Sequence, residues 1–139
     1  MEKSLVLIKP DAIKRRVGGA IQSRLEEKGL KVVGLKMLHV DKALAERHYA
    51  VHAGKPFFND LINYICSTPI IAIVFEGKDA VRVIREVMGA TDPAKAEPGT
   101  IRRDFGLGIQ ENAVHGSDSV ETAKKEIGLF FQPDEIYNY

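Results

Sequence analysis

Short apolar runs, several of them bounded by glycine or proline, predict four strands along the chain. Residues 4–8 (SLVLI) are β-prone and end before Pro10, which has no N–H for a sheet ladder. Residues 30–40 alternate between apolar and polar positions, and Gly34 inside this run indicates a bulge or a close backbone approach. Residues 69–77 (PIIAIVFEG) are almost continuously apolar, as a strand buried on both faces would be. Residues 112–115 form a fourth, short strand.

Apolar residues spaced three and four apart predict helices between these strands. In residues 17–28 such positions share one face, and Gly29 follows where a left-handed residue commonly ends a helix. The other predicted helices cover residues 42–50, 57–67, 79–88 and 118–131. The last of them begins with Asp118 and Glu121, three residues apart, which is a capping-box pattern.

Turn residues mark the start of one of these helices, the end of another and one long loop. Asp41 is placed to cap the helix that follows it, and Gly89 is placed to end the helix before it. Residues 91–111 are rich in proline and glycine and are expected to be irregular. Because a long loop in a compact domain is usually functional, a site is expected there.

The order of these elements predicts an α+β fold. Strand, helix, strand, helices, strand, helix, strand and helix follow one another, which is a βαββαβ-like order. That order packs as an antiparallel, ferredoxin-like sheet with helices on one face. No linker or repeat divides the sequence, so residues 1–139 are expected to form a single domain.

Composition excludes several classes of protein. The 139 residues are 45% hydrophobic and 28% charged, which suits a globular domain rather than a disordered tail or a fibre. Twenty Lys and Arg against 19 Asp and Glu give a net charge of +1, so any anion site must be local. The only cysteine, Cys66, excludes an internal disulfide and is expected to be a buried, inert thiol. The apolar runs are too short for a signal peptide or a membrane span, so a cytoplasmic protein is expected.

Two histidines raise the question of a zinc site. His48 and His52 lie four residues apart on a predicted helix, which is the spacing of paired zinc ligands. The rest of such a site is missing, because position 49 is Tyr rather than the Glu of H-E-x-x-H. We therefore expect both histidines on the surface or beside a site. Neither a Walker A pattern nor G-x-G-x-x-G occurs, which excludes a P-loop fold and leaves no case for a dinucleotide site.

His115 is the strongest candidate for chemistry. It stands at the end of the last predicted strand, just before a helix N-terminus, where backbone N–H groups and the helix dipole favour an anion. A neutral imidazole is nucleophilic, and it attacks best when its second nitrogen donates to a carboxylate or carbonyl. Glu126 in the last helix is the candidate partner. The alternatives are a loop histidine without a role and a solvated helix carboxylate.

Cationic and aromatic residues near the predicted loop suit a phosphate-bearing ligand. The cationic residues are Arg82, Arg85, Arg102 and Arg103, with Lys9 at the end of the first strand. Guanidinium groups bind phosphate oxygens through paired N–H donors, and Thr91 adds a hydroxyl. For each cation taken singly, a surface salt bridge is the equal alternative. Phe57 and Phe58 pack in a core or offer one ring to a base.

Five segments, in matching order and at matching spacing, together resemble the nucleoside diphosphate kinase family. They are 9–11 (KPD), 49–58 (YAVHAGKPFF), 89–91 (GAT), 98–102 (PGTIR) and 112–119 (NAVHGSDS). They span nearly the whole chain, and the pattern NxxHGSD around a central histidine is the most diagnostic. The resemblance implies an enzyme that carries out phosphoryl transfer.

The resemblance also implies a role for each matched residue. His115 takes the γ-phosphoryl group of a nucleoside triphosphate on Nδ1 and passes it to a second nucleoside diphosphate in a ping-pong cycle. Glu126 and Ser117 match the residues that orient the imidazole. The remaining matches contact the nucleotide: Arg85, Thr91 and Arg102 at the phosphates, Lys9 and Asn112 at the ribose hydroxyls and phosphates, Tyr49 against the transferring group, His52 near the phosphates, and Phe57 stacked on the base. Because every base has a face to stack on, broad base tolerance is expected.

The cofactor and partners implied by the resemblance are Mg²⁺ and nucleoside tri- and diphosphates. Mg²⁺ would bridge phosphate oxygens and reach the protein at most through Asp118 and water. The family assembles from a common dimer, so a homo-oligomer, tetramer or hexamer, is expected, with no membrane and no specific nucleic acid. Arg103 and Glu111 depart from the family pattern, which bears on local salt bridges and subunit contacts but leaves the nucleophile untouched.

The alternative function is a non-catalytic ferredoxin-like nucleotide or nucleic-acid binding module, because such sheets also serve as RNA and ligand platforms. The near-neutral charge and the lack of an aromatic pair in an RNP-like strand argue against it. An inactive family member would be expected to lack the histidine or its cationic neighbours, all of which are present.

Overall fold

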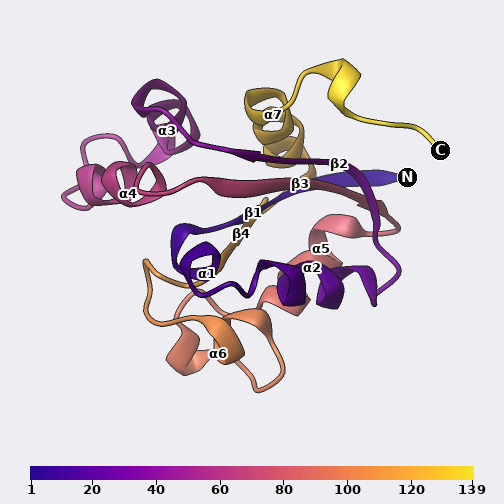
Figure 1. The fold of residues 1–139 in the computed structure, drawn as a ribbon, viewed down its shortest axis with the longest axis horizontal. Coiled ribbons are helices and arrows are strands. Elements are labelled where there is room, and N and C mark those ends of the chain that lie inside the picture. The colour runs from indigo at the N-terminus through magenta and orange to yellow at the C-terminus, as the bar shows by residue number, and fades with distance from the viewer.

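Four strands form one antiparallel sheet in the computed structural model, which describes residues 1–139 (Figure 1). Their bounds are β1 Glu2–Ile8, β2 Lys31–Leu38, β3 Ile70–Gly77 and β4 Val114–Gly116. The order across the sheet is β2-β3-β1-β4, so β1 and β3 are central while β2 and β4 are edges. Each strand overlaps the run that predicted it, and the ferredoxin-like α+β class is confirmed.

Seven α-helices connect and cover the strands. They are α1 Pro10–Lys14, α2 Gly18–Glu26, α3 Lys42–His48, α4 Phe58–Ile65, α5 Ala80–Met88, α6 Ile101–Phe105 and α7 Val120–Phe130, with single 3₁₀ turns at Ala50–His52, Pro93–Lys95 and Pro133–Glu135. None of these helices is both long and apolar enough to cross a membrane.

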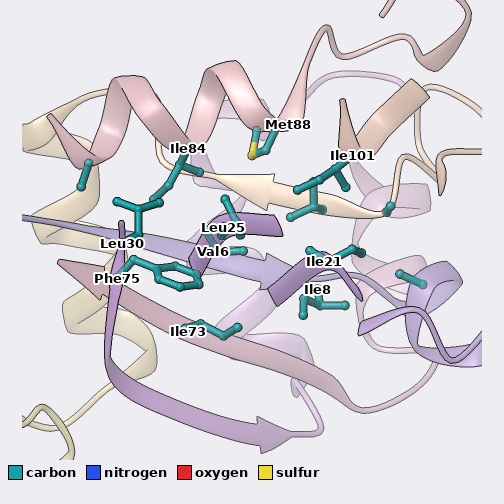
Figure 2. Close-up of a cluster of buried hydrophobic side chains, with 14 residues drawn as sticks. Val6, Ile8, Ile21, Leu25, Leu30, Ile73, Phe75, Ile84, Met88 and Ile101 are labelled. Carbon is teal, nitrogen blue, oxygen red and sulfur yellow. The ribbon is translucent and has the colours of Figure 1, made fainter. Parts of the chain in front are cut away.

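The helices cover both faces of the sheet, so the expectation of one covered face is wrong (Figure 1). Side chains alternate along β1, which places Leu5 and Leu7 in one apolar layer and Val6 and Ile8 in the other. The first layer is closed by α3, α4 and α7. The second, shown in Figure 2, is closed by α2, α5 and α6. A strand order alone does not say on which side each connection crosses.

Two helices and one cap differ from prediction. Pro10 does end β1, but it also begins α1, where its missing N–H removes no helical bond. The stretch predicted to be irregular contains α6, which Thr100 caps by accepting from the Arg103 N–H. The N-cap of α7 is Ser119 rather than Asp118, because the Ser119 hydroxyl accepts from the Thr122 N–H.

Other local predictions are confirmed. Asp41 caps α3 through a 2.8 Å bond from the Leu44 N–H, and Gly89 ends α5 with a φ of +84°. The register of β2 against β3 shifts between Val32 and Gly34, which is the predicted irregularity. A Cβ at Gly34 would also lie 3.2 Å from the Phe131 ring, so the backbone approach is close as well.

Candidate active site

The His115 imidazole is held by a buried carboxylate. His115 Nε2 lies 3.0 and 3.1 Å from the two oxygens of Glu126, and the Ser117 hydroxyl donates to Glu126 Oε1 at 2.6 Å. An ionised carboxylate only accepts hydrogen bonds, so Nε2 carries the proton and donates it. Nδ1 is left with a lone pair, which is the arrangement that a nucleophilic imidazole needs.

The sheet register explains why these two residues meet. His115 pairs with Leu7 across β1 and β4, and Leu7 belongs to the layer closed by α3, α4 and α7. Val114 points to the opposite layer, so the side chain of His115 is directed to the face on which α7 lies. Glu126 is on the buried side of α7, the side that packs against this face of the sheet.

Glu126 remains ionised in spite of its burial. Loss of water raises the pKa of this carboxyl, but the bonds from His115 and Ser117 outweigh that effect and the net pKa lies below its usual value. The carboxylate is therefore available as a hydrogen-bond acceptor at neutral pH, as the inferred histidine tautomer requires.

The ring of His115 opens onto a cavity of about 390 Å³, and its side chain is 26% exposed. The basic side chains that line the cavity are Arg47, Arg85, Arg102 and Lys125, and the carboxylates are Asp118 and Glu126. Because β4 is an edge strand, the cavity wraps around the sheet edge and takes residues from helices on both faces. A chain of nearly zero net charge thus concentrates cations at one imidazole.

Arg102 is a buried cation without a carboxylate partner. Its guanidinium donates to the carbonyls of Gly89, at 3.2 Å, and Val114, at 3.0 Å, while Nε has no partner. Burial, together with the charge of Arg85, lowers its pKa to about 10. Since an uncompensated buried charge is costly, an anion in the cavity would stabilise this arrangement. Arg85 and Thr91 line the same cavity.

Lys9 and Asn112 lie beside the cavity and tie its loop in place. Lys9 Nζ donates to the Gln110 carbonyl at 2.6 Å and to Asn112 Oδ1 at 2.9 Å, and Asn112 Nδ2 donates to the Thr91 carbonyl at 3.0 Å. Burial lowers the pKa of Lys9 to about 8. Neither side chain lines the cavity itself.

Tyr49, His52 and Phe57 form one side of the cavity and its rim. Tyr49 and His52 line the cavity, and the ring of Phe57, 45% exposed, lies 5.3 Å from that of His52. Burial raises the pKa of Tyr49 to about 12, so the phenol keeps its proton. Phe58, by contrast, packs against the apolar layer closed by α3, α4 and α7. Of the two aromatic residues, Phe58 therefore belongs to the core, and Phe57 is the one exposed at the cavity rim.

His48, which sequence reasoning placed either on the surface or beside a site, is buried next to His115. Its side chain is 2% exposed, its ring centroid lies 4.8 Å from that of His115, and burial lowers its pKa to about 3. His48 Nδ1 stands 3.7 Å from Glu126 Oε2, too far for a hydrogen bond. The spacing of His48 from Ala45, three residues apart on the buried side of α3, is the signal that could have found it.

His48 and His52, whose spacing raised the question of a shared zinc site, do not come together. The helix ends at His48, and a 3₁₀ turn carries His52 away to Lys55 and Phe57. The two side chains therefore do not share a helix face, which agrees with the rejection of a zinc site on that pair. His52 has a lowered pKa because of burial and the nearby Lys55.

Four other singled-out residues serve the scaffold. Arg82 forms exposed ion pairs with Asp79 and Glu86, which was its alternative interpretation. Arg103, one of the two departures from the family pattern, donates to the carbonyls of Ala94 and Ala96. Glu111, the other, bonds through its main-chain carbonyl, which accepts from the Leu107 N–H. Cys66 is partly exposed rather than buried, although burial still raises the pKa of its thiol.

Comparisons with known proteins agree on one family. The family model described as nucleoside diphosphate kinase matches residues 2–136. A nucleoside diphosphate kinase of Dehalococcoides mccartyi is 55% identical over all of this chain and 98% of its own length. One from Pyrococcus furiosus is 54% identical over all of this chain and 88% of its own length.

Solved structures give the same result. The nucleoside diphosphate kinase of Halobacterium salinarum, in complex with CDP, matches with a TM-score of 0.97 and 47% identity over 99% of this chain and 92% of that one. The enzyme of Aquifex aeolicus matches with a TM-score of 0.95 and 38% identity over 98% of this chain and 99% of that one.

Proposed function

The chain belongs to the nucleoside diphosphate kinase family and is a phosphotransferase, and we propose that it works through a phosphohistidine at His115 in a ping-pong cycle. The observation that carries this proposal is the bond from His115 Nε2–H to Glu126, which leaves Nδ1 with its lone pair beside a cationic cavity. That combination suits an imidazole that attacks phosphorus and then gives the group up again.

The two half-reactions balance on this one side chain. Nδ1 attacks the γ-phosphorus of a nucleoside triphosphate, the bond from phosphorus to the bridging oxygen breaks, and the diphosphate leaves with that electron pair. A terminal oxygen of a second nucleoside diphosphate then attacks the same phosphorus, and the N–P bond breaks. His115 returns to its neutral form, with its Nε2 proton held by Glu126 throughout.

The cationic residues of the cavity are proposed to stabilise the transferring group. Arg102, Arg85 and Thr91 supply donors, and two carbonyl contacts fix the guanidinium of Arg102 in advance. Donors that are already in place meet the charge on the phosphoryl oxygens without reorganisation, and loss of one commonly costs about 10²- to 10³-fold in rate. The Tyr49 hydroxyl is proposed to lie against the same group.

Nucleotide binding is proposed to extend from the cavity to its exposed rim. Phe57 would stack on the base, His52 would approach the phosphates, and Lys9 and Asn112 would reach the ribose and phosphates. The exposure of Phe57 supports stacking, because a core aromatic would be covered. Stacking reads no base edge, so broad base tolerance follows. The CDP complex of the Halobacterium relative supports a diphosphate as one substrate.

Mg²⁺ is proposed as the cofactor carried by the nucleotide. The donor set fits this, because Glu126 is committed to His115 and Ser117, and Asp118 alone is a carboxylate free of hydrogen bonds and ion pairs in the cavity. Mg²⁺ keeps its waters and favours phosphate oxygens over a protein cage, and when bound it neutralises phosphate charge. Asp118 would reach it through water.

A homo-oligomer of single-domain chains is also proposed, as a tetramer or hexamer. Both apolar layers share the central strands β1 and β3, which supports one domain over residues 1–139. The edge strand β2 exposes Leu35 and Met37, which supports association along that edge. Sedimentation equilibrium distinguishes the two assemblies.

The test is phosphoenzyme formation. Incubation with γ-labelled ATP and Mg²⁺ is expected to label the protein with one acid-labile, alkali-stable phosphoryl group, and intact mass is expected to show the same addition. The variant His115→Ala should take no label, whereas His39→Ala, at an exposed histidine that contacts the Cys66 carbonyl, should label fully. Nucleotide binding without any label would favour the non-catalytic module instead.

A further inference from the structure

We propose that His48, His115 and Glu126 together form a binding site for Zn²⁺ or a similar transition-metal cation, and that its occupation stops phosphoryl transfer. The binding part of this proposal stands on the geometry alone. The inhibitory part rests on the proposed function, because it requires His115 to be the nucleophile.

The first observation is the spacing of three ligand atoms. One atom from each of the three residues lies within 4.8 Å of the others, and Glu126 Oε2 lies 3.1 Å from His115 Nε2 and 3.7 Å from His48 Nδ1. Tetrahedral zinc with ligands at about 2.1 Å needs neighbouring ligand atoms roughly 3.4 Å apart. The two separations from Glu126 Oε2 already lie within about half an ångström of that value.

The second observation is that both ring nitrogens of His48 are buried without a hydrogen-bond partner. The ring is surrounded instead by the rings of Tyr49, His115 and Phe130, which offer edges and faces but no acceptor for its N–H. A buried polar group without a hydrogen-bond partner destabilises the folded chain. The phosphotransfer mechanism does not use this imidazole. Its Nδ1, 3.7 Å from Glu126 Oε2, is therefore an available metal ligand without another partner.

The donor set selects the class of cation. Two imidazoles and one carboxylate suit Zn²⁺, whereas Mg²⁺ and Ca²⁺ favour oxygen ligands throughout. Three protein ligands leave a fourth position for water, and His115 borders the cavity where that water would enter. The site is therefore distinct from the nucleotide-borne Mg²⁺ near Asp118.

Occupation of this site removes the nucleophile. A cation on His115 Nε2 requires that nitrogen to give up its proton, and in the neutral ring the proton moves to Nδ1. Glu126 changes from hydrogen-bond acceptor to ligand, and the Nδ1 lone pair that would attack phosphorus is lost. The same tautomer logic that activates His115 in the free protein thus inactivates it in the metal complex.

The test begins with binding in the absence of nucleotide. Co²⁺, as a spectroscopic substitute for Zn²⁺, is expected to give the visible absorption of a four-coordinate site with one ion per chain, and Zn²⁺ is expected to displace it. The variant His48→Phe keeps a ring of similar size but removes one metal ligand. Its metal affinity should fall by more than the roughly 10- to 100-fold lost when only a residue that hydrogen-bonds a ligand is removed. Cys66→Ser removes the only thiol and should bind as well as the unmodified chain.

Imidazole ¹⁵N NMR on the unmodified chain gives a readout that no variant's folding can disturb. Zn²⁺ is expected to shift the nitrogens of His48 and His115 and leave those of His39 and His52 in place. Shifts confined to His39, or Co²⁺ absorption that survives His48→Phe and disappears in Cys66→Ser, would overturn the site. Binding at His48 without any loss of phosphoenzyme would overturn the inhibition, and absence of phosphoenzyme in metal-free protein would instead contradict the proposed function.

Discussion

At the scale of single residues, the chemistry depends on how the hydrogen-bonding capacity of Glu126 is divided. One carboxylate accepts from His115 on both oxygens and from Ser117 on one of them. This arrangement decides the tautomer of the nucleophile, and it also lowers the pKa of a buried acid that would otherwise tend to be neutral. Ser117 thus acts on His115 through Glu126 and needs no contact with the substrate.

His48 gives the residue scale a testable pH dependence. Its pKa is held at about 3 by burial, against 6.5 in an exposed histidine, so between these values the unfolded chain binds a proton that the folded chain does not. Stability therefore falls as pH falls through this window, by about 1.4 kcal/mol per pH unit for one proton. His48→Phe should remove that share of the pH dependence of the free energy of unfolding, measured by urea denaturation from pH 6.5 towards pH 4. Equal slopes in His48→Phe and the unmodified chain would contradict the neutral, buried imidazole.

At the scale of elements, the last helix shows how a small cap supports the site. The Ser119 hydroxyl caps α7, the helix that carries Glu126 to His115. Ser119→Ala is expected to lower the free energy of unfolding by about 1 kcal/mol. Asp118→Ala, next to it, should change stability far less, because Asp118 makes no capping bond. Guanidinium chloride denaturation compares the two variants. A larger loss of unfolding free energy in Asp118→Ala would mean that Asp118 is the N-cap, as the capping-box pattern predicted.

The same scale shows what a sequence pattern can and cannot predict. Strands were predictable because apolar alternation and its limits are local, as at Pro10 and Gly34. Helix α6 was not, because the five residues Ile101–Phe105 are too few for a periodicity and its stability comes from the Thr100 cap and the burial of Ile101. The cap of α7 was misplaced by one residue because Asp and Ser stand side by side, and both are good caps.

The site, too, could be predicted from the sequence only in part. The local pattern singled out His115, Glu126, Arg85 and Arg102, and the resemblance gave them roles. The structure brings those side chains to one sheet edge and adds Arg47 and Lys125, which sequence reasoning had not indicated. For His48 the sequence did not decide between the surface and the site, because a buried imidazole is recognised by what surrounds it, and its neighbours come from α7 and β4, far away in sequence. The roles given to Lys9 and Asn112 stay predictions, since both are occupied in holding the loop.

At the scale of the whole molecule, attraction of a polyanion must come from charge placement rather than total charge. The chain carries a net charge of +1, yet exposed Arg47 and Lys125 stand at the same cavity as buried Arg102. Exposed charges act over about one Debye length, roughly 10 Å at 0.1 M salt and 3 Å at 1 M. Arg47 and Lys125 are therefore expected to strengthen nucleotide binding without entering the chemical step.

The double variant Arg47→Ala/Lys125→Ala tests this placement. Each exposed charge is worth about 0.2–1 kcal/mol, so ATP affinity should fall by up to roughly fivefold per residue at low salt while kcat stays the same. The deficit should shrink as salt rises to 1 M. Lys42→Ala removes an equally exposed charge outside the cavity and should leave affinity unchanged. A loss as large in Lys42→Ala would mean that the field of the whole molecule, and not its local concentration at His115, attracts the nucleotide.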